Sequence, residues 1–223
     1  MTFDLFDATL NRILAAGDYA GFKKALIDSN CDRCGLHKGR TNLVVDRGSP
    51  ASRILVIGEG PGAQEDAQGR AFVGRSGQLL DKIMAAIGLD SEKDLLIANV
   101  VKCRPLDSEG QNRAPTPAEA QTCFPYLRRQ IELIAPKVIL LLGATAFRYM
   151  DPNRKDFSMG KEAGKFITLP DYPGIEAMVL YHPAALLRNP NLKADMWEHV
   201  KALKKRLVEM DVMKPAAGKA GNF

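Results

Sequence analysis

The chain has 223 residues, 46% hydrophobic and 26% charged, with a formal net charge of +5. These values suit a globular protein, so we expect one domain over residues 1–212 and a disordered tail at 213–223. No apolar run reaches the roughly 18 residues of a membrane span. The acidic start is unlike a signal peptide, which predicts a cytoplasmic protein without a membrane partner. The mild basic excess suits a polyanionic partner.

Apolar periodicity predicts helices and strands that alternate along the chain. One or two amphipathic helices are expected over residues 3–27. Strands are expected at 53–57, 95–101, 137–142 and 177–181. Helices are expected at 76–88, 117–134, 144–150 and about 191–210. This alternation predicts an α/β fold, a three-layer αβα sandwich around a central, mainly parallel sheet of four strands. The Pro-, Gly- and charge-rich segment 151–176 is expected to form an irregular excursion or a hairpin.

The loop Gly58–Asp66 follows the first expected strand and combines glycine, proline and carboxylates. It lacks the Lys-Ser/Thr pair of a P-loop and does not match Gly-x-Gly-x-x-Gly. Its glycines allow close backbone approach to a ligand at the carboxyl end of a parallel strand. The carboxylates Glu59 and Glu65 would repel a phosphate, but they suit a bound water or a neutral hydrogen-bonding ring. An ordinary strand-to-helix turn is the alternative.

Four cysteines are spread along the chain, at Cys31, Cys34, Cys103 and Cys123. Structural disulfides are uncommon in the cytosol, and the Cys-x-x-Cys pair precedes the first clear strand, unlike a thioredoxin-type motif. Four thiolates suit tetrahedral zinc or an iron–sulfur cluster, and the spacing does not choose between them. The alternative is four small buried hydrophobic residues.

Two further polar residues follow expected strands. Asn99 lies in an apolar strand, and the donor and acceptor of its amide match the N3–H and O4 edge of a uracil ring. His182 follows a strand and precedes a proline, which places it at the same sheet edge as a general acid or a donor to a developing oxyanion. The alternatives are an amide satisfied by a neighbouring loop and a packing histidine.

Two more segments have features typical of proteins that flip bases out of DNA. Leu186 and Arg188 place apolar bulk beside a cation, as a wedge into stacked bases requires. Phe72 stands between glycines and arginines, where its ring can stack on a base. Ser76 opens a helix whose free N–H groups can hold a phosphate. The structural alternatives are a helical turn packed on the core for the segment of Leu186 and Arg188, and a core aromatic for Phe72.

Together these segments resemble the uracil-DNA glycosylase superfamily, and most closely its iron–sulfur family 4. The matching motifs occur in order, and the resemblance runs from about Cys31 to Arg206. They are Gly58-Glu59-Gly60-Pro61-Gly62-Ala63-Gln64-Glu65-Asp66, Gly69-Arg70-Ala71-Phe72-Val73-Gly74-Arg75-Ser76-Gly77, Asn99-Val100-Val101-Lys102-Cys103-Arg104-Pro105 and His182-Pro183-Ala184-Ala185-Leu186-Leu187-Arg188.

The resemblance implies excision of uracil from DNA by a monomeric enzyme, with these roles for its residues. Glu59 and Gly60 would give backbone contacts to uracil, Phe72 would stack on it, Asn99 would read its edge and His182 would bind O2. Glu65 would hold the attacking water or guard the C5 position. The four cysteines would ligate a structural [4Fe–4S] cluster, and Leu186 with Arg188 would fill the gap in the base stack.

Two features qualify this expectation. Gly60 stands where better-known uracil-DNA glycosylases have a catalytic aspartate, which family 4 also lacks, and this implies slower chemistry. Loop 106–114 is longer than usual, and a related branch carries there a histidine that traps the abasic sugar covalently. This loop has no histidine, which favours turnover. The rival hypotheses are a covalent-trapping relative, a DNA-binding module without catalysis and a nucleotide-binding regulator.

Overall fold

The computed structural model describes residues 7–214 of the chain. Residues 3–6 of the first expected helix and residues 215–223 of the expected disordered tail lie outside this range. Within it, no helix is both long and apolar enough to cross a membrane.

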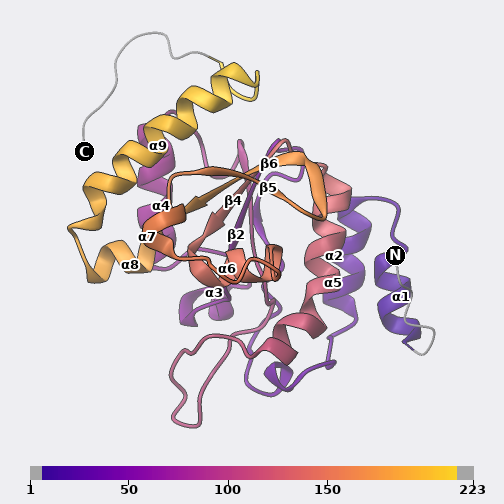
Figure 1. Ribbon diagram of the computed structural model, residues 1–223. Coiled ribbons are helices and arrows are strands. Elements are labelled where there is room, and N and C mark those ends of the chain that lie inside the picture. Colours follow the sequence, from indigo (N-terminus) through magenta and orange to yellow (C-terminus); the bar gives the residue numbers. More distant parts are fainter. Residues whose placement is uncertain (1–6, 215–223) are drawn as a thin grey trace.

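A six-stranded sheet forms the centre of the molecule (Figure 1). Its strands lie in the order β1-β3-β2-β4-β6-β5. The strands are β1 (Arg47–Gly48), β2 (Ile54–Gly58), β3 (Leu95–Asn99), β4 (Val138–Leu142), β5 (Phe166–Leu169) and β6 (Tyr172–Leu180). The four expected strands are confirmed as β2, β3, β4 and β6, and they pair in parallel. The antiparallel strands β1 and β5 extend this parallel centre at its two edges, and of these two strands β1 was not expected from the sequence.

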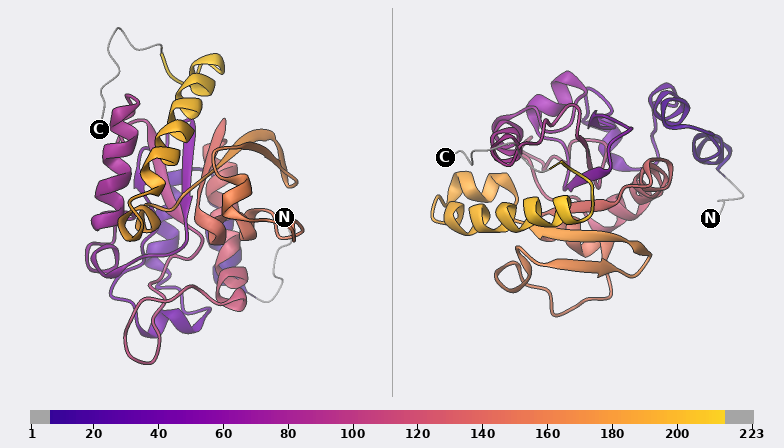
Figure 2. Two further views of the ribbon diagram at one scale, coloured as in Figure 1. Left: turned by 60° about the vertical axis from the view of Figure 1, so that its left-hand side comes forward. Right: turned by 90° about the horizontal axis from the view of Figure 1, so that it is seen from above.

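Helices cover both faces of the sheet, which confirms the three-layer architecture (Figure 2). Successive residues of β2 point to opposite faces: Leu55 and Ile57 join one core cluster, and Ile54 and Val56 join the other. The first cluster packs against α1 (Ala8–Leu14), α2 (Tyr19–Asp28), α5 (Pro117–Ile134) and α6 (Gly143–Met150). The second packs against α4 (Arg75–Ala86), α8 (Pro183–Arg188) and α9 (Leu192–Glu209). Burial on both faces explains the continuous apolar runs of these strands.

Local sequence signals fix several helix ends. The α5 helix occupies the expected range 117–134 because Thr116 and Glu119 form a reciprocal capping box and Pro117 fills the first turn. The α4 helix begins at Arg75, one residue before the expected start, with Gly74 at its N-cap. Short helices that the sequence analysis did not predict are α3 (Ala63–Gln68), α7 (Met159–Glu162) and the 3₁₀ helix η1 (Gly35–Lys38), whereas α8 corresponds to the helical turn given as the alternative for that segment.

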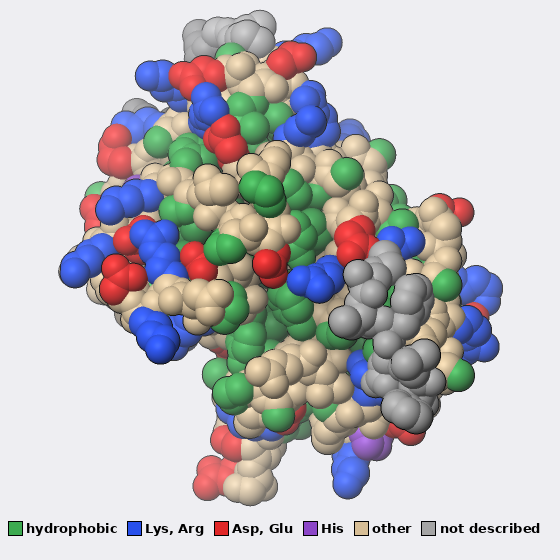
Figure 3. Space-filling model, turned by 45° about the vertical axis from the view of Figure 1, so that its right-hand side comes forward, with side chains coloured by type: hydrophobic (Ala, Val, Ile, Leu, Met, Phe, Trp, Pro, Cys, Tyr) green, Lys and Arg blue, Asp and Glu red, His purple; other side chains and the backbone are tan. Residues whose placement is uncertain are grey.

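Segment 151–176 contains α7 and leads into a hairpin of β5 and β6, in agreement with the expected hairpin. On the face drawn in Figure 3, Lys and Arg side chains are interspersed with Asp and Glu side chains. The net positive charge is therefore not gathered into one continuous basic patch on that face. The expectation of a single domain over residues 1–212 stays a prediction.

Candidate active site and cysteine site

The loops after β2, β3, β4 and β6 enclose a cavity of about 420 Å³ at one edge of the sheet. Parallel strands bring these loops together because their carboxyl ends meet at that edge. Eight residues singled out from the sequence line the cavity: Glu59, Gly60, Glu65, Phe72, Ser76, Asn99, His182 and Arg188. Segments far apart in the chain thus converge on one space, which is large enough for a nucleobase.

Asn99, the last residue of β3, is the most unusual group in this cavity. Its side chain is 1% exposed, yet neither its Oδ1 nor its Nδ2 has a hydrogen-bond partner in the described part of the chain. Leaving a buried amide unpaired costs about 1–3 kcal/mol. An amide at a cavity wall that carries this cost is available to a ligand with a complementary donor and acceptor.

Phe72 and Asn99 both lie against Gly58, whose lack of a side chain leaves room for them. A Cβ added to Gly58 would lie 2.4 Å from the Phe72 ring and 2.6 Å from Asn99 Oδ1. Phe72 itself has a left-handed backbone with φ of 53°, which costs about 1–2 kcal/mol for a residue with a side chain. The ring is held so that it faces the imidazole of His182, with centroids 5.6 Å apart.

His182 caps the N-terminus of α8. Its Nδ1 accepts a hydrogen bond from the N–H of Ala184 at 3.1 Å, so the neutral ring carries its proton on Nε2. Burial, together with the charge of Arg188, lowers the pKa of His182 to about 4, and Glu65 opposes this shift. At neutral pH this imidazole is therefore an uncharged donor of one N–H to the cavity.

Glu65 holds two loops of the site together. One carboxylate oxygen accepts from the N–H of Gly74 at 2.7 Å, and the other accepts from the N–H of Gly62 at 3.1 Å. Glu65 therefore joins the N-terminus of α3 to that of α4. Glu59 is held in a different way, since its carboxylate accepts a hydrogen bond from the hydroxyl of Thr145 at the start of α6.

The α8 segment corrects one expectation. Leu186, expected to enter the base stack, is only 2% exposed and packs in the second core cluster, because the helical turn points it towards the interior. Its neighbour Leu187 is 41% exposed and is the apolar side chain that this segment offers to solvent. Arg188 and Ser76 do line the cavity.

Lys102 lies behind the cavity and is 1% exposed. Its Nζ donates to the carbonyl of Asn99 at 2.8 Å and to Oε1 of Gln130. Gln130 in turn donates to the hydroxyl of Tyr19, which donates to Asp46. Burial lowers the pKa of Lys102 to about 8, and nearby Cys123, Asp46 and Cys103 oppose this shift. A lysine in an apolar run gave no sequence signal of this interior role.

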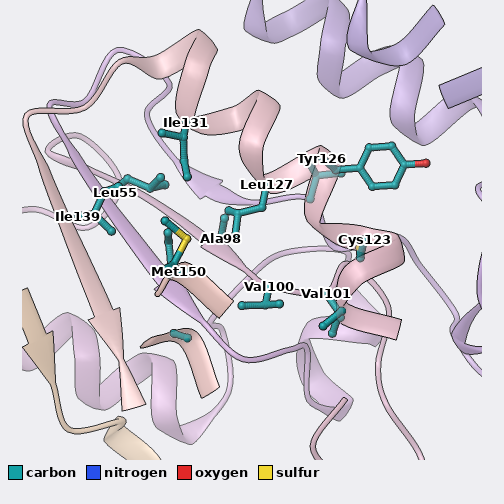
Figure 4. Close-up of a cluster of buried hydrophobic side chains, with 14 of the residues drawn as sticks. Leu55, Ala98, Val100, Val101, Cys123, Tyr126, Leu127, Ile131, Ile139 and Met150 are labelled. Atoms are coloured by element: carbon teal, nitrogen blue, oxygen red, sulfur yellow. The ribbon is translucent and has the colours of Figure 1, made fainter. Parts of the chain in front are cut away.

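The four cysteines surround one small cavity of about 10 Å³ next to Lys102. Cys123 on α5 lies beside Val101, just past the end of β3 (Figure 4). Its Sγ accepts from the N–H of Lys102 at 3.3 Å, and Cys103 Sγ accepts from Arg40, also at 3.3 Å. Burial raises the pKa of Cys103 to about 11 and that of Cys123 to about 12. As they stand, no group of three or more His, Cys, Asp or Glu side chains in residues 7–214 is placed to hold a metal ion.

Comparison with known proteins gives the family. Residues 45–204 match the model of the uracil DNA glycosylase superfamily. A type-4 uracil-DNA glycosylase of Thermotoga maritima is 45% identical over 160 residues, which cover 71% of this chain and 79% of the relative. One of Saccharolobus solfataricus is 41% identical over 181 residues, covering 79% and 82%. The chain belongs to the type-4 branch of the uracil-DNA glycosylase superfamily.

A type-5 uracil-DNA glycosylase of Pyrobaculum aerophilum is a more distant relative, 28% identical over 149 residues, which cover 60% of this chain and 62% of the relative.

The cavity of this type-4 member is also lined by residues that the sequence analysis did not assign to the site. Thr145 enters from the start of α6, and Asn112 and Arg113 enter from loop 106–114. Arg113 is fixed by two hydrogen bonds to Glu119 of the α5 capping box. The capping signal of Thr116 and Glu119 can be recognised in the sequence, but the ion pair of Glu119 with Arg113 cannot.

Proposed function

We propose that this chain flips uracil out of DNA and hydrolyses its N-glycosidic bond, releasing free uracil and leaving an abasic site. Its family supports this reaction, and the observation that carries it is the buried amide of Asn99, which has no partner in the described chain. The edge of uracil presents an N3–H donor and an O4 acceptor. Asn99 offers the matching Oδ1 acceptor and Nδ2 donor.

The chemistry requires stabilisation of negative charge more than a strong base. Cleavage of the bond leaves an oxocarbenium-like sugar and a uracil anion, whose charge spreads over its oxygens. The neutral His182 would donate its Nε2–H to O2, and Asn99 Nδ2 would donate to O4. Donors already fixed before the reaction need no reorganisation when the charge develops, which is the source of their catalytic effect.

The other cavity residues would orient the base and the water. Phe72 would stack on the flipped ring, and the main chain of Glu59 and Gly60 would contact its edge. Glu65 would hold the attacking water or guard the C5 position against a methyl group. Since both of its oxygens already accept backbone N–H groups, this carboxylate is fixed in place for that role.

DNA would contact the rim of the cavity. Ser76, in the first turn of α4, and Arg188 at the end of α8 would hold phosphates. The exposed Leu187, rather than the buried Leu186, would fill the gap that the flipped base leaves. We further propose that the enzyme acts as a cytoplasmic monomer on uracil-containing DNA.

The four cysteines would hold a [4Fe–4S] cluster. Their chemistry fits the group, because four thiols line one buried space and two of their sulfurs accept N–H bonds from Lys102 and Arg40. Both of these residues also bring positive charge to a cluster whose thiolate ligands are negative. The cluster would join the segment of Cys31 and Cys34 to α5 and to the end of β3, as a structural group.

A strand with a single uracil tests the proposal. After incubation with the protein, alkali breaks the strand at abasic sites, and a denaturing gel shows the break. We expect cleavage at uracil and none in a matched thymine strand. An intact uracil strand, with protein that is folded and iron-loaded, would contradict the proposal and favour a binding module. A shifted, alkali-resistant protein–DNA band would instead indicate covalent trapping.

A further inference from the structure

Lys102 is an interior lysine bonded through its side chain and its main chain. Its Nζ donates to the Asn99 carbonyl at 2.8 Å, and its own N–H donates to Cys123 Sγ at 3.3 Å. Its carbonyl accepts from the N–H of Val44 at 2.8 Å. One residue thus contacts the uracil-reading strand end, the cysteine site and a segment that precedes β1.

The stretch from Asn99 to Lys102 is hydrogen-bonded to the end of β2 and to the loop that follows it. The N–H of Val100 donates to the Gly58 carbonyl at 3.0 Å, and the N–H of Val101 donates to the Glu59 carbonyl at 3.2 Å. These bonds tie the end of β3 to the loop that follows β2. The Lys102 side chain folds back over this stretch and donates a hydrogen bond to the carbonyl of Asn99, three residues earlier.

The Asn99 side chain depends on this main-chain support. Neither of its polar atoms bonds to another described residue, so no protein hydrogen bond sets the direction of the amide. Asn99 Oδ1 lies against Gly58, and the backbone carbonyl of the same residue is held by Lys102. A misplacement of about 1 Å in a catalytic group can lower a rate about 100-fold.

We propose that Lys102 is a positioning residue, which fixes the main chain of Asn99 for uracil excision and links it to the cysteine site. This inference rests on the proposed function for its kinetic part. Lys102 itself lies behind the cavity and does not line it, so it acts through Asn99.

A purely structural role is the alternative, and the hydrogen-bond chain separates the two. From Lys102 the chain continues through Gln130 to Tyr19 and then to Asp46. Removing the Tyr19 hydroxyl breaks the outer links and leaves the bond between Lys102 and Asn99 in place. Gln130 keeps a second acceptor for its amide, the carbonyl of Val45 at 3.2 Å.

The kinetic test compares Lys102→Met with Tyr19→Phe in the iron-loaded protein. Methionine keeps most of the apolar stem and removes the ammonium group. We expect the single-turnover excision rate of Lys102→Met to fall about 100-fold with KM for uracil DNA unchanged, while Tyr19→Phe excises as the unchanged protein does. A normal rate in Lys102→Met, or an equal loss in both variants, would overturn the proposal.

If Lys102→Met does not fold, Lys102→Gln serves in its place, since it removes the ammonium group that binds the Asn99 carbonyl and keeps a shorter polar side chain beside Gln130. Its rate should fall below that of Tyr19→Phe, and a rate equal to that of Tyr19→Phe would overturn the proposal.

Amide hydrogen exchange gives a measurement that does not depend on activity. The N–H groups of Val100 and Val101 should exchange faster in Lys102→Met and at the normal rate in Tyr19→Phe; unchanged protection in both would contradict the positioning role. Absence of excision by the unchanged protein would refute the proposed function alone, because amide exchange still tests the positioning.

Discussion

The cavity proposed to bind uracil and the cysteine site behind it share one stretch of chain, yet their buried polar groups are satisfied in opposite ways. At the cavity wall, the amide of Asn99 has no hydrogen-bond partner in residues 7–214. Three residues later, Lys102 is equally buried, and its ammonium, N–H and carbonyl groups all have partners. The Asn99 amide is thus left available for a ligand, whereas every polar group of Lys102 is used within the protein.

The physical reason lies in the cost of an unpaired group. An unsatisfied buried amide costs about 1–3 kcal/mol, and a buried unpaired charge costs more. The fold can bear the first cost where a ligand later supplies the partners. It offsets the second with the Asn99 carbonyl and Gln130. Substitutions at the two sites should therefore have opposite effects on stability, although both should lower activity.

Asn99→Ala is the variant that should change activity most. We expect excision to fall by about 10²–10³-fold, the loss seen when one preorganised donor is removed. Melting temperature should stay the same or rise, since the variant also removes an unpaired amide. Single-turnover excision and thermal unfolding measure the two effects. Excision close to that of the unchanged protein would contradict the role given to Asn99.

Cys123→Ser should have the largest effect on stability. Loss of a structural metal group costs more than about 4 kcal/mol, and for a chain of this size that lowers the melting temperature by more than about 8 °C. Bound iron and visible absorption should be lost as well. Ser52→Ala is the control, because Ser52 is buried at the far end of the sheet and bonds only backbone carbonyls and N–H groups. It should keep full iron content.

Leu186→Ala and Leu187→Ala test which leucine of α8 supports the core and which one faces DNA. Truncation of the buried Leu186 should cost about 2–5 kcal/mol of stability. Truncation of the exposed Leu187 should cost within about 0.5 kcal/mol and slow excision from duplex DNA more than from single strands. Denaturant unfolding and parallel excision assays measure both. A stability loss at Leu187 larger than that at Leu186 would show that the assignment of the two leucines is wrong.

His182 should make stability depend on pH in a defined window. Its pKa, about 4 in the fold, lies below its ordinary value of 6.5 because burial disfavours the charged ring. The neutral ring therefore contributes stability that is present above pH 6.5 and is lost as pH falls towards 4. The melting temperature of the unchanged protein, relative to that of His182→Gln, should therefore fall as the pH is lowered from 6.5 to about 4. A constant difference would contradict a neutral His182.

Arg188→Ala should give the smallest effect. If Arg188 contacts one phosphate, its removal should reduce the slope of log affinity against log salt by about 0.9 for duplex DNA. Binding to strands with and without uracil should weaken equally. The measurement is a salt titration of DNA affinity. An unchanged slope would remove Arg188 from the phosphate-binding residues.

Most of the framework was predictable because it depends on local signals. The continuous apolar run of β2 and the Thr116 capping box before α5 are legible without tertiary contacts. The edge strand β1 was not predicted and the bounds of β5 within its hairpin were not, since two and four residues give too short a pattern. Polar α3 likewise has no apolar period. Pro183 at the first position of α8 is a local signal for the helical turn that was the alternative at this segment.

The residue types of the site were predictable, but their partners were not. Motifs placed Asn99 and His182 at strand ends, and the sheet then brings their loops together. The bond from Glu65 to Gly74 spans two loops, and the burial of Lys102 depends on Gln130 of α5. Such contacts arise only from tertiary packing, and lysine is by default a surface residue.

The most direct test of the central claim observes the Asn99 amide itself. Nuclear magnetic resonance of its side-chain NH₂ group, assigned by loss of the signal in Asn99→Ala, reports whether the amide is paired. On addition of free uracil, the signals should shift downfield and their exchange with water should slow, whereas thymine should have a weaker effect. Signals that uracil leaves unmoved, in a protein that excises uracil, would contradict the claim that Asn99 is kept unpaired for the base.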